Sequence, residues 1–305
     1  MRPPLPLGRR DLGAQLALTV VAPRPQLALG GHRHRVGRAR GHGPHAAQTT
    51  NLLGQRHVVG NHALAELRSA GVDVTGVREV PGDSGIAMIA VDDSGDNVIV
   101  VAPGANHEWP DVVDFAFSTH DVVVLQLEIP LGVVHDVARA ARRAGARVVL
   151  NAAPALPEAS VLLPDVDTVV VNEGEAAELL GLSETTVEGV ADIVERTGVD
   201  VVVTLGADGA IVGAQGAAPR RIDSIRVAAV DTVGAGDAFV GAFAAALASG
   251  AGVAAAAQRG SAAGALTVTQ PGARHPALSP ELIDDLLATA DASRASSAPS
   301  DTRSP

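Results

Sequence analysis

The stretch Val230-Asp231-Thr232-Val233-Gly234-Ala235-Gly236-Asp237-Ala238-Phe239 precedes a run of small residues, 240–249, whose composition is typical of a helix. Gly234 and Gly236 permit positive φ and close approach of a ligand to the backbone, and the free N–H groups at a helix start attract negative charge. A carboxylate beside such amides can take a proton from a hydroxyl during phosphoryl transfer. The stretch therefore predicts an anion hole with Asp237 as its base.

A purely structural interpretation is the alternative. It makes Asp237 a helix-start residue favoured by the helix dipole, and the two glycines a tight turn. Two other phosphate-binding motifs are excluded. A dinucleotide fingerprint would need Gly or Ala where the chain has Phe239. A P-loop would need a lysine, and all 23 basic residues of this chain are arginine.

Length and composition predict a single large α/β domain with a small lid. A chain of 305 residues with 47% hydrophobic content can bury a substantial core. It has no cysteine, which excludes disulfides and thiolate metal sites. No apolar run approaches the roughly 20 residues that a membrane-spanning helix needs. We therefore expect a soluble, intracellular, cytoplasmic protein.

Charge divides the chain into two unlike parts. Residues 1–62 hold nine arginines, six histidines and one acidic residue, which gives a net charge of +8. Residues 63–305 have a net charge of −19, and the two parts together give the −11 of the whole chain. The acidic part argues against nonspecific binding to nucleic acid or membranes. We expect neither as a partner.

Residues 1–62 have neither strand nor helix periodicity and are rich in Arg, His, Pro and Gly. A twin-arginine export signal at Arg9-Arg10, a transit peptide and a histidine metal site are possible interpretations. The apolar run after Arg10 is short, and the histidine spacings match no metal motif. We favour a disordered segment or one translated out of frame, because GC-rich DNA read in a wrong frame yields this composition.

From Ala63 onward, strands alternate with helices, which predicts parallel strands joined by crossover helices. Residues 85–102 form a predicted lid hairpin whose tip is Asp92–Asp96. Residues 291–305 resemble a disordered tail. The other predicted segments are helix 63–70, strand 121–127, helix 133–144, strands 147–150 and 168–171, helices 173–180 and 187–197, strand 201–205, a β-rich stretch 210–227, and helices 236–249, 253–269 and 280–290.

Two further stretches carry candidate chemistry. In 169–176, Asn172 and Glu175 follow a predicted strand, where they form either a helix capping box or a phosphate and metal site. In 203–210, a strand runs into a glycine turn, which as a lone feature indicates only a hairpin.

In combination, these motifs resemble those of the ribokinase-like (pfkB-type) carbohydrate kinases over residues 63–290. The resemblance implies a central, mostly parallel sheet flanked by helices, with a small β lid that is incomplete in this chain. In that family the counterpart of Asp237 is the catalytic base, and N-x-x-E helps to hold nucleotide phosphates and Mg²⁺. The stretches 101–106 and 125–130 resemble the ribokinase branch, whose counterpart of Glu128 lies at the sugar. Residues 267–273 resemble a stretch whose backbone carbonyls help to bind K⁺. The family's sugar-binding G-G-K-G-A-N loop has no counterpart here.

The resemblance implies a role for each matching residue. Asp237 and Glu128 would contact the sugar, with Asp237 also the base. Gly234, Ala235 and Gly236 would bind the transferring phosphoryl group. Glu175 would organise Mg²⁺ indirectly. The implied nucleotide-binding residues are Asn172, Thr204, Leu205, Gly206, Ala207, Asp208, Gly209, Gly236, Asp237 and Ser261. The implied K⁺ ligands are Asp231, Val233, Thr267, Gln270 and Gly272.

The implied activity is ATP-dependent phosphorylation of a primary hydroxyl, with D-ribose the favoured acceptor and ATP, Mg²⁺ and K⁺ as cofactors. Family members pair through their lids, which makes a homodimer the expected assembly. Two alternatives stay open. One is a kinase of another sugar or of a nucleoside, and the other is a nucleotide-binding protein that lacks the N-terminal sugar site and is impaired in catalysis.

Overall fold

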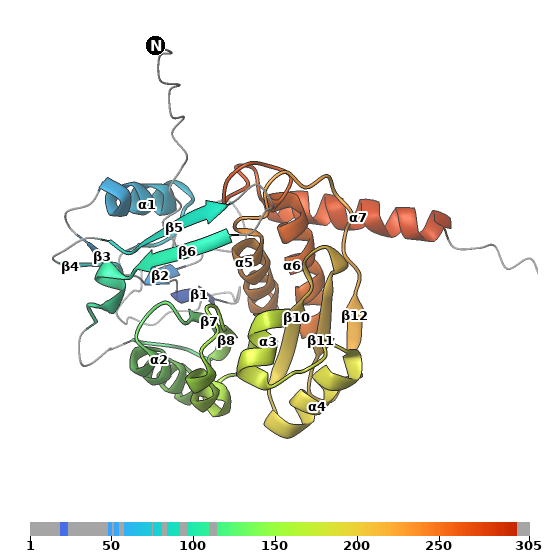
Figure 1. Ribbon diagram of the computed structural model, residues 1–305, viewed down its shortest axis with the longest axis horizontal. Helices are drawn as coiled ribbons and strands as arrows, with labels where there is room; N and C mark the ends of the chain where they lie inside the picture. The colour runs from blue at the N-terminus through green and yellow to red at the C-terminus, as the bar shows by residue number, and fades with distance from the viewer. Residues whose placement is uncertain are drawn as a thin grey trace, which may run out of the picture. The chain divides into compact units, whose positions relative to one another are not determined.

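A computed structural model describes residues 19–23, 48–50, 52–54, 58–74, 76–80, 84–91, 97–109 and 115–297 (Figure 1). The chain divides into two compact units, an N-terminal unit of residues 1–154 and a C-terminal unit of residues 155–305. Each unit is built around strands of consecutive apolar residues.

In the N-terminal unit, four strands pair in the order β2-β1-β7-β8. β1 (Thr19–Pro23) is antiparallel both to β2 (Gln48–Thr50) and to β7 (Asp121–Gln126), whereas β7 is parallel to β8 (Arg147–Asn151). Val122 to Leu125 of β7 are all buried, as expected of a strand covered on both faces. The crossover between β7 and β8 is α2 (Leu131–Arg143), which buries Val134, Val137, Ala138 and Ala141.

The rest of this unit holds a helix and two strand pairs. α1 (Val58–Ser69) precedes β4 (Arg78–Val80), which is parallel to β3 (Leu52–Gly54). β5 (Ile86–Val91) and β6 (Asn97–Ala102) form the expected antiparallel pair, and the predicted tip at 92–96 lies outside the described residues. A short 3-10 helix, η1 (Gly104–His107), follows. Its Asn106 is buried against Gly85, where a Cβ would lie 3.0 Å from the Asn106 Nδ2.

The C-terminal unit begins with η2 (Pro157–Asp165), β9 (Thr168–Asn172) and α3 (Glu173–Leu180). α4 (Val187–Thr197) then leads to β10 (Asp200–Thr204), which is parallel to β9 and in register with it from Thr168 to Asn172. The three central valines of each strand are buried. The predicted β-α-β order is therefore confirmed for this part of the chain.

Two antiparallel strands extend this sheet. β11 (Ala210–Gly213) pairs with β10 and with β12 (Arg220–Ile222). All four residues of β11 are buried, and both α4 and α6 contact the strand (Figure 1). At Gly213 a Cβ would lie 2.8 Å from methyl carbons of Val190 and Val194, so α4 packs directly on the strand backbone.

Helices α5 (Ala235–Ala248) and α6 (Val253–Thr267) lie side by side in this unit (Figure 1). At Gly260 of α6 a Cβ would stand 2.9 Å from the Phe239 carbonyl oxygen and 3.0 Å from its ring. Phe239 stacks on Phe243 with ring centroids 6.2 Å apart. The two helices approach closely because residues without a side chain face the start of α5.

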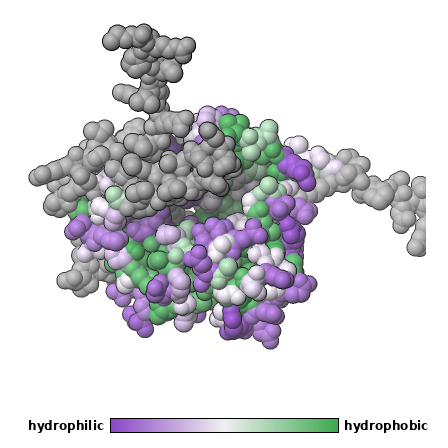
Figure 2. Space-filling view, viewed as in Figure 1, coloured by the Kyte–Doolittle hydropathy of each residue, from purple (hydrophilic) through white to green (hydrophobic). Residues whose placement is uncertain are grey.

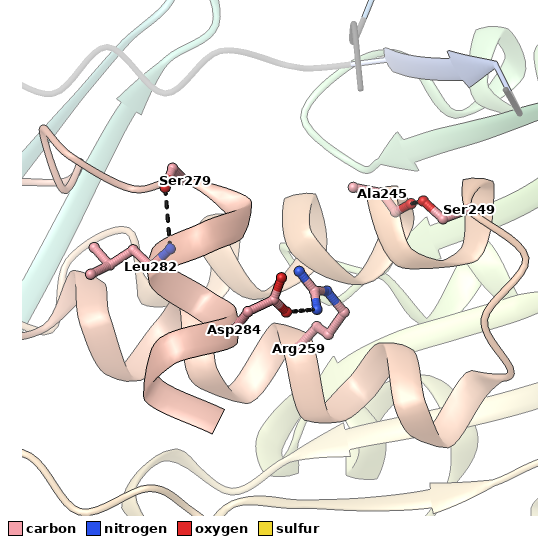
Figure 3. Close-up of polar contacts among 6 residues, drawn as sticks. All are labelled: Ala245, Ser249, Arg259, Ser279, Leu282 and Asp284. Carbon is pink, nitrogen blue, oxygen red and sulfur yellow. Dashed lines mark hydrogen bonds and ion pairs between the residues drawn. The ribbon is translucent and has the colours of Figure 1, made fainter. Parts of the chain in front are cut away.

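The last helix, α7 (Pro280–Ser297), packs on α6 through Ile283, which joins Ala262 and Ala263 in one apolar cluster. Figure 3 shows the polar contacts that fix it. The Ser279 Oγ accepts the Leu282 N–H at 3.2 Å, which caps the helix start, and Arg259 of α6 pairs with Asp284. In the same view, Ser249 after α5 donates its hydroxyl to the Ala245 carbonyl at 2.9 Å.

Several element boundaries differ from those predicted. α1 begins at Val58 instead of Ala63, and β1, β2 and β3 fall within 1–62, the segment expected to be disordered. The rest of that segment lies outside the described residues, so the interpretation of 1–62 stays a prediction. α7 ends at Ser297 instead of Ala290, because helix-compatible Ala and Ser continue until Pro299. Of the β-rich stretch 210–227, only β11 and β12 are strands.

The surface of the described residues is mixed in character. Figure 2 shows hydrophilic residues over the outer side of α4, where Glu188, Asp192 and Glu195 are exposed on the face opposite buried Val190 and Ile193. Such an amphipathic pattern is typical of a helix that covers a sheet. Among the described helices, none combines the length and apolar character that crossing a membrane requires.

The contact at Gly260 yields a test of the packing. We expect Gly260→Ala to lower the free energy of unfolding, because overpacking a tight contact costs about 1–3 kcal/mol. Gly241→Ala on α5 is the matched control, since nothing lies within 4 Å of its Cβ position. It should instead stabilise the protein by about 0.5–1 kcal/mol through helix propensity. Urea denaturation measures both, and equal effects would contradict the close approach of α5 and α6.

Candidate active site

The carboxyl ends of β9 and β10 bring two of the predicted nucleotide-binding residues together. Asn172 and Thr204 are register partners at the last positions of these parallel strands. The Thr204 hydroxyl donates to the Val171 carbonyl across the strands at 3.3 Å. In open α/β sheets, ligands bind at this edge, beyond the carboxyl ends of the strands.

Asn172 also begins α3 as its N-cap. Its Oδ1 accepts the Glu175 N–H and the Glu175 Oε2 accepts the Asn172 N–H, each at 2.8 Å, which completes a capping box. Burial raises the pKa of Glu175, the hydrogen bond from the Asn172 N–H lowers it, and the nearby Glu178 carboxylate raises it, with a net increase. The structural interpretation of this pair is therefore confirmed. The capping box uses the Oε2 atom of the Glu175 carboxylate.

The predicted nucleotide loop, residues 204–209, is a tight turn between β10 and β11 that contains η3 (Gly206–Asp208). The Leu205 N–H donates to the Gly209 carbonyl at 2.8 Å, and the Asp208 N–H donates to the Leu205 carbonyl at 3.0 Å. Gly209 has φ 91°, and a Cβ there would lie 2.0 Å from the Ile222 carbonyl oxygen. At Gly206, φ is 54° and the Cβ position is open. The loop's own backbone hydrogen bonds and two glycines with positive φ therefore set its conformation.

Sequence reasoning missed one contact of the nucleotide loop. The Arg221 guanidinium on β12 donates to the Asp208 carbonyl at 3.2 Å. The acceptor is a backbone oxygen, which every residue has, so the amino-acid types in the loop do not indicate this contact. Only the pairing of β11 with β12 could have predicted it.

The two glycines of the glycine loop, residues 230–237, serve different purposes. Gly234 is the N-cap of α5 with φ 78°, and a Cβ there would lie 2.0 Å from the Ala273 carbonyl oxygen. No other residue fits at this position. At Gly236 nothing lies within 4 Å of the Cβ position. The protein itself therefore requires Gly234, whereas at Gly236 it leaves open space beside the first amides of α5.

Asp237 lies in the first turn of α5, as predicted. Its residue surface is exposed, yet the protein atoms around the carboxylate desolvate it and raise its pKa above the usual range. No hydrogen bond or ion pair to another described residue holds this carboxylate. An accessible carboxylate with a raised pKa beside helix-start amides is suited to accept a proton.

Asp231 lies at the junction of the glycine loop with the loop that follows α6, residues 268–273. Its Oδ1 accepts the Val233 N–H at 3.0 Å and its Oδ2 accepts the Gly272 N–H at 2.9 Å. These two bonds, that from Val233 first, lower the pKa of Asp231. Backbone contacts support the same junction, because the Val230 and Asp231 N–H groups both donate to the Val268 carbonyl, at 2.7 and 3.2 Å.

The remaining predicted K⁺ ligands lie in the same region. The Gln270 N–H donates to the Thr267 carbonyl at 3.3 Å, while the Thr267 hydroxyl donates to Ala263 within α6. The structure thus groups Asp231, Val233 and Gly272 directly, with Thr267 and Gln270 joined at the end of α6. Among the described residues, no cluster of three or more His, Asp or Glu side chains could hold a metal ion. A cation here would depend largely on backbone oxygens.

Two predicted residues lie apart from these loops. Ser261 lies on α6, and its buried Oγ has no hydrogen-bond partner among the described residues. A neighbouring glycine, Gly264, faces the Ala235 carbonyl of α5, with its Cβ position 3.3 Å from that oxygen. Glu128 belongs to the N-terminal unit, where it follows β7 and donates its N–H to the Gln126 Oε1 at 2.8 Å.

Comparison with known proteins agrees with these features. Residues 46–280, well over half of the chain, match the model of the pfkB family carbohydrate kinases. The chain belongs to this family. The match begins upstream of Ala63, the position from which the sequence motifs predicted it.

The chain is similar to several individual members of the pfkB family. A ribokinase of Schizosaccharomyces pombe is 35% identical over 63% of this chain, and a deoxyribokinase of Salmonella typhi is 33% identical over 61%. The matched part spans 64% of the length of each relative. The structure of Arabidopsis thaliana ribokinase complexed with ribose and ATP covers 80% of this chain and 82% of its own, with 29% identity and a TM-score of 0.71. The predicted ribokinase-like α/β fold is confirmed.

The hydrogen bonds of Asp231 predict an acid-dependent stability difference. Folding lowers the pKa of Asp231, so its carboxylate stabilises the folded protein at pH values above the unfolded-state pKa of about 3.9. This stabilisation is lost as the pH falls through the folded-state pKa. Asp231→Asn should therefore be less stable than the parent at pH 7, and the gap should narrow below about pH 4. Thermal unfolding from pH 7 to 2.5 measures it. Asp192→Asn, on the exposed face of α4, is the control for the loss of one surface carboxylate. A stability gap independent of pH would contradict the contribution of the two Asp231 hydrogen bonds.

Proposed function

We propose that this chain transfers the γ-phosphoryl group of ATP to the primary hydroxyl of a sugar, with D-ribose the favoured acceptor. The observation that carries the proposal is the carboxylate of Asp237, accessible and raised in pKa, in the first turn of α5 beside the open position of Gly236. Membership of the pfkB family of carbohydrate kinases supports the reaction class.

In this mechanism Asp237 accepts the proton of the sugar hydroxyl as its oxygen attacks the γ-phosphorus. The new bond joins that oxygen to phosphorus, the bond between the γ-phosphorus and the β,γ-bridging oxygen breaks, and ADP leaves with the electron pair. A raised pKa suits the task, because a general base works best when its pKa approaches the working pH. Partial desolvation of Asp237 supplies that increase.

The amides at the start of α5 stabilise the charge on the transferring group. The first N–H groups of a helix have no intrahelical acceptor and point outward along the helix axis. The open space at Gly236 lets phosphoryl oxygens come close to this backbone. Such preorganised donors are typically worth about 10²–10³ in rate.

The nucleotide is held at the edge formed by Asn172 and Thr204 and by the loop from Leu205 to Gly209. The parallel pairing of β9 and β10 places the two residues side by side, and hydrogen bonds of the Asn172 Oδ1 and the Thr204 hydroxyl hold their side chains. The loop's own hydrogen bonds fix its backbone. Ser261 is the remaining proposed nucleotide contact, and it lies on α6 with a buried Oγ that has no hydrogen-bond partner among the described residues.

Magnesium would be held indirectly by Glu175. One carboxylate oxygen of Glu175 is engaged in the capping box, and a water-mediated contact suits the other, since Mg²⁺ usually keeps several of its waters. When bound, Mg²⁺ neutralises charge on the nucleotide phosphates. The capping box orients the Glu175 side chain for this contact.

The proposed K⁺ ligands, Asp231, Val233, Thr267, Gln270 and Gly272, belong to the junction between the glycine loop and the loop after α6. The Asp231 carboxylate remains ionised there and has lone pairs beyond its two amide bonds. Backbone carbonyls complete an oxygen-only set, the kind that hard cations prefer. A cation at this junction would stiffen the segment that leads into Asp237.

The choice of D-ribose rests on the relatives. Of the two relatives named above, the ribokinase is the more similar, and the solved plant ribokinase was bound to ribose and ATP. The similarity to a deoxyribokinase makes deoxyribose a second acceptor to assay. Glu128 stays a predicted sugar contact. We also propose a cytoplasmic protein that pairs as a homodimer.

A second candidate function is nucleotide binding without sugar phosphorylation. The observation that favours it is the absence of a G-G-K-G-A-N loop from the sequence, together with its lack of lysine. Losing contacts to the sugar would reduce the rate as well as the affinity, because positioning carries much of such a reaction. ATP binding without ribose-dependent ADP release would identify this function.

The role of Asp237 is tested by Asp237→Asn in a coupled ADP-release assay with ribose. The amide keeps the side-chain shape but cannot accept the proton, so turnover should fall about 10²–10⁴-fold. ATP affinity should stay within a few-fold of the parent. In the parent, kcat should decline as acid protonates Asp237. Asp192→Asn serves as the control, and near-parental turnover of Asp237→Asn would rule out the base.

The cation proposal predicts a difference between two salts. Replacing Na⁺ with K⁺ at constant ionic strength should raise turnover, since fixed ionic strength removes simple screening. Asp231→Asn should lose this response, while Asp192→Asn should keep it. Equal rates in the two salts would argue against a K⁺ site.

A further inference from the structure

Arg221 on β12 contacts the backbone of the nucleotide loop, residues 204–209. Its guanidinium donates to the Asp208 carbonyl at 3.2 Å. The N–H of the same peptide group, that of Gly209, donates to the Gly206 carbonyl at 3.2 Å. The peptide group between Asp208 and Gly209 is therefore held at both its carbonyl and its N–H.

A second contact joins the end of this loop to the same strand. A Cβ at Gly209 would lie 2.0 Å from the Ile222 carbonyl oxygen and 2.7 Å from the Ser224 backbone nitrogen. Gly209 also has φ 91°, a value that residues with a side chain rarely adopt. The end of the loop thus lies directly against the backbone that follows Arg221.

The other side of the nucleotide loop is open. Gly206 and Ala207 are both exposed, and nothing lies within 4 Å of the Cβ position of Gly206. A ligand can therefore approach the loop at these two residues while Arg221 contacts it at Asp208.

Arg221 is suited to hold this loop at any working pH. A guanidinium has five N–H donors and stays charged throughout the range in which proteins are folded. β12 is a three-residue strand at the edge of the sheet, paired with β11, and Arg221 is exposed there. The acceptor is a backbone carbonyl, so the contact fixes the path of the loop and not merely a side chain.

The path of a binding loop affects affinity. When a loop must be ordered as its ligand binds, the free-energy cost of ordering is subtracted from the free energy of binding. A loop already held in its bound conformation avoids that cost and binds more tightly. A contact that orders the loop from outside the site therefore changes affinity without touching the ligand.

We propose that Arg221 is a positioning residue that holds the nucleotide loop in place and thereby sets the affinity for ATP. The inference rests on the proposed function, in which residues 204–209 bind the nucleotide. In this role Arg221 contacts neither the sugar nor the transferring phosphoryl group. Its effect falls on nucleotide binding and not on the chemical step.

The test compares Arg221→Met, which removes the donor and keeps a long side chain, with Arg221→Lys and Arg220→Met. We expect Arg221→Met to raise the KM for ATP about 5–10-fold, the scale of one hydrogen bond, and to leave kcat and the KM for ribose unchanged. Arg221→Lys keeps a charged donor and should bind ATP more tightly than Arg221→Met. Arg220→Met should match the parent, because adjacent strand residues point to opposite faces.

Hydrogen exchange of the protein without nucleotide gives a readout that does not depend on activity. In Arg221→Met the Asp208 and Gly209 amides should exchange faster than in the parent, while the amides of β11 and β12 keep parental rates. This pattern also decides if Arg221→Met melts at a lower temperature than the parent. Faster exchange throughout β11 and β12 overturns the proposal, because the side chain then supports the sheet, and so does a parental KM for ATP.

Failure of the two proposals is distinguishable. If the parent binds ATP but transfers nothing to sugars, the proposed kinase activity fails, and the dissociation constants of the variants for ATP still test Arg221. If Arg221→Met and Arg220→Met weaken ATP binding equally, the effect belongs to surface charge and the role of Arg221 is overturned. A parent that binds no nucleotide overturns both proposals.

Discussion

Close contact between backbones at the start of α5 is the constraint on which the candidate site depends. Gly234 lies against the Ala273 carbonyl, Gly260 against the Phe239 carbonyl, and Gly264 against that of Ala235. At Gly234 and Gly260, where a Cβ would lie 2.0 and 2.9 Å from these oxygens, a larger residue does not fit without displacement of the backbone, whereas the 3.3 Å at Gly264 requires only a small adjustment. The direction of the α5 amides, and with it the position of Asp237, follows from these contacts.

Two aspartates of one loop have opposite electrostatic environments. Asp231 accepts two backbone N–H groups, which lower its pKa and keep it ionised as a link between loops. Asp237, six residues later, is desolvated without a partner among the described residues, which raises its pKa. Environments that separate the pKa values of two carboxylates commonly separate their roles. One aspartate here supports the backbone, and the other is placed for chemistry.

Much of this arrangement was predictable from the sequence, because its signals are local. Runs of valine predicted β9 and β10, and Asn172 followed by Glu175 predicted a capping box as one of two interpretations. The glycine loop was recognisable for the same reason. Contacts made by backbone atoms were not predictable. Every residue has a carbonyl group, so nothing in the identities of Ala273 and Asp208 indicates that their carbonyls make these contacts. The start of α1, the extension of α7 and the division into two units also depend on tertiary contacts.

The unequal surroundings of Gly234 and Gly236 bear on how this loop can change over generations. Substitution at Gly234 is blocked by the protein's own backbone, whether or not a ligand is ever bound. At Gly236 the folded chain has room, so only a bound molecule would select against a side chain. If selection for ligand binding were relaxed, substitutions would therefore accumulate at Gly236 while Gly234 stayed unchanged. Variation confined to that position would mark lineages that keep the fold after abandoning the chemistry.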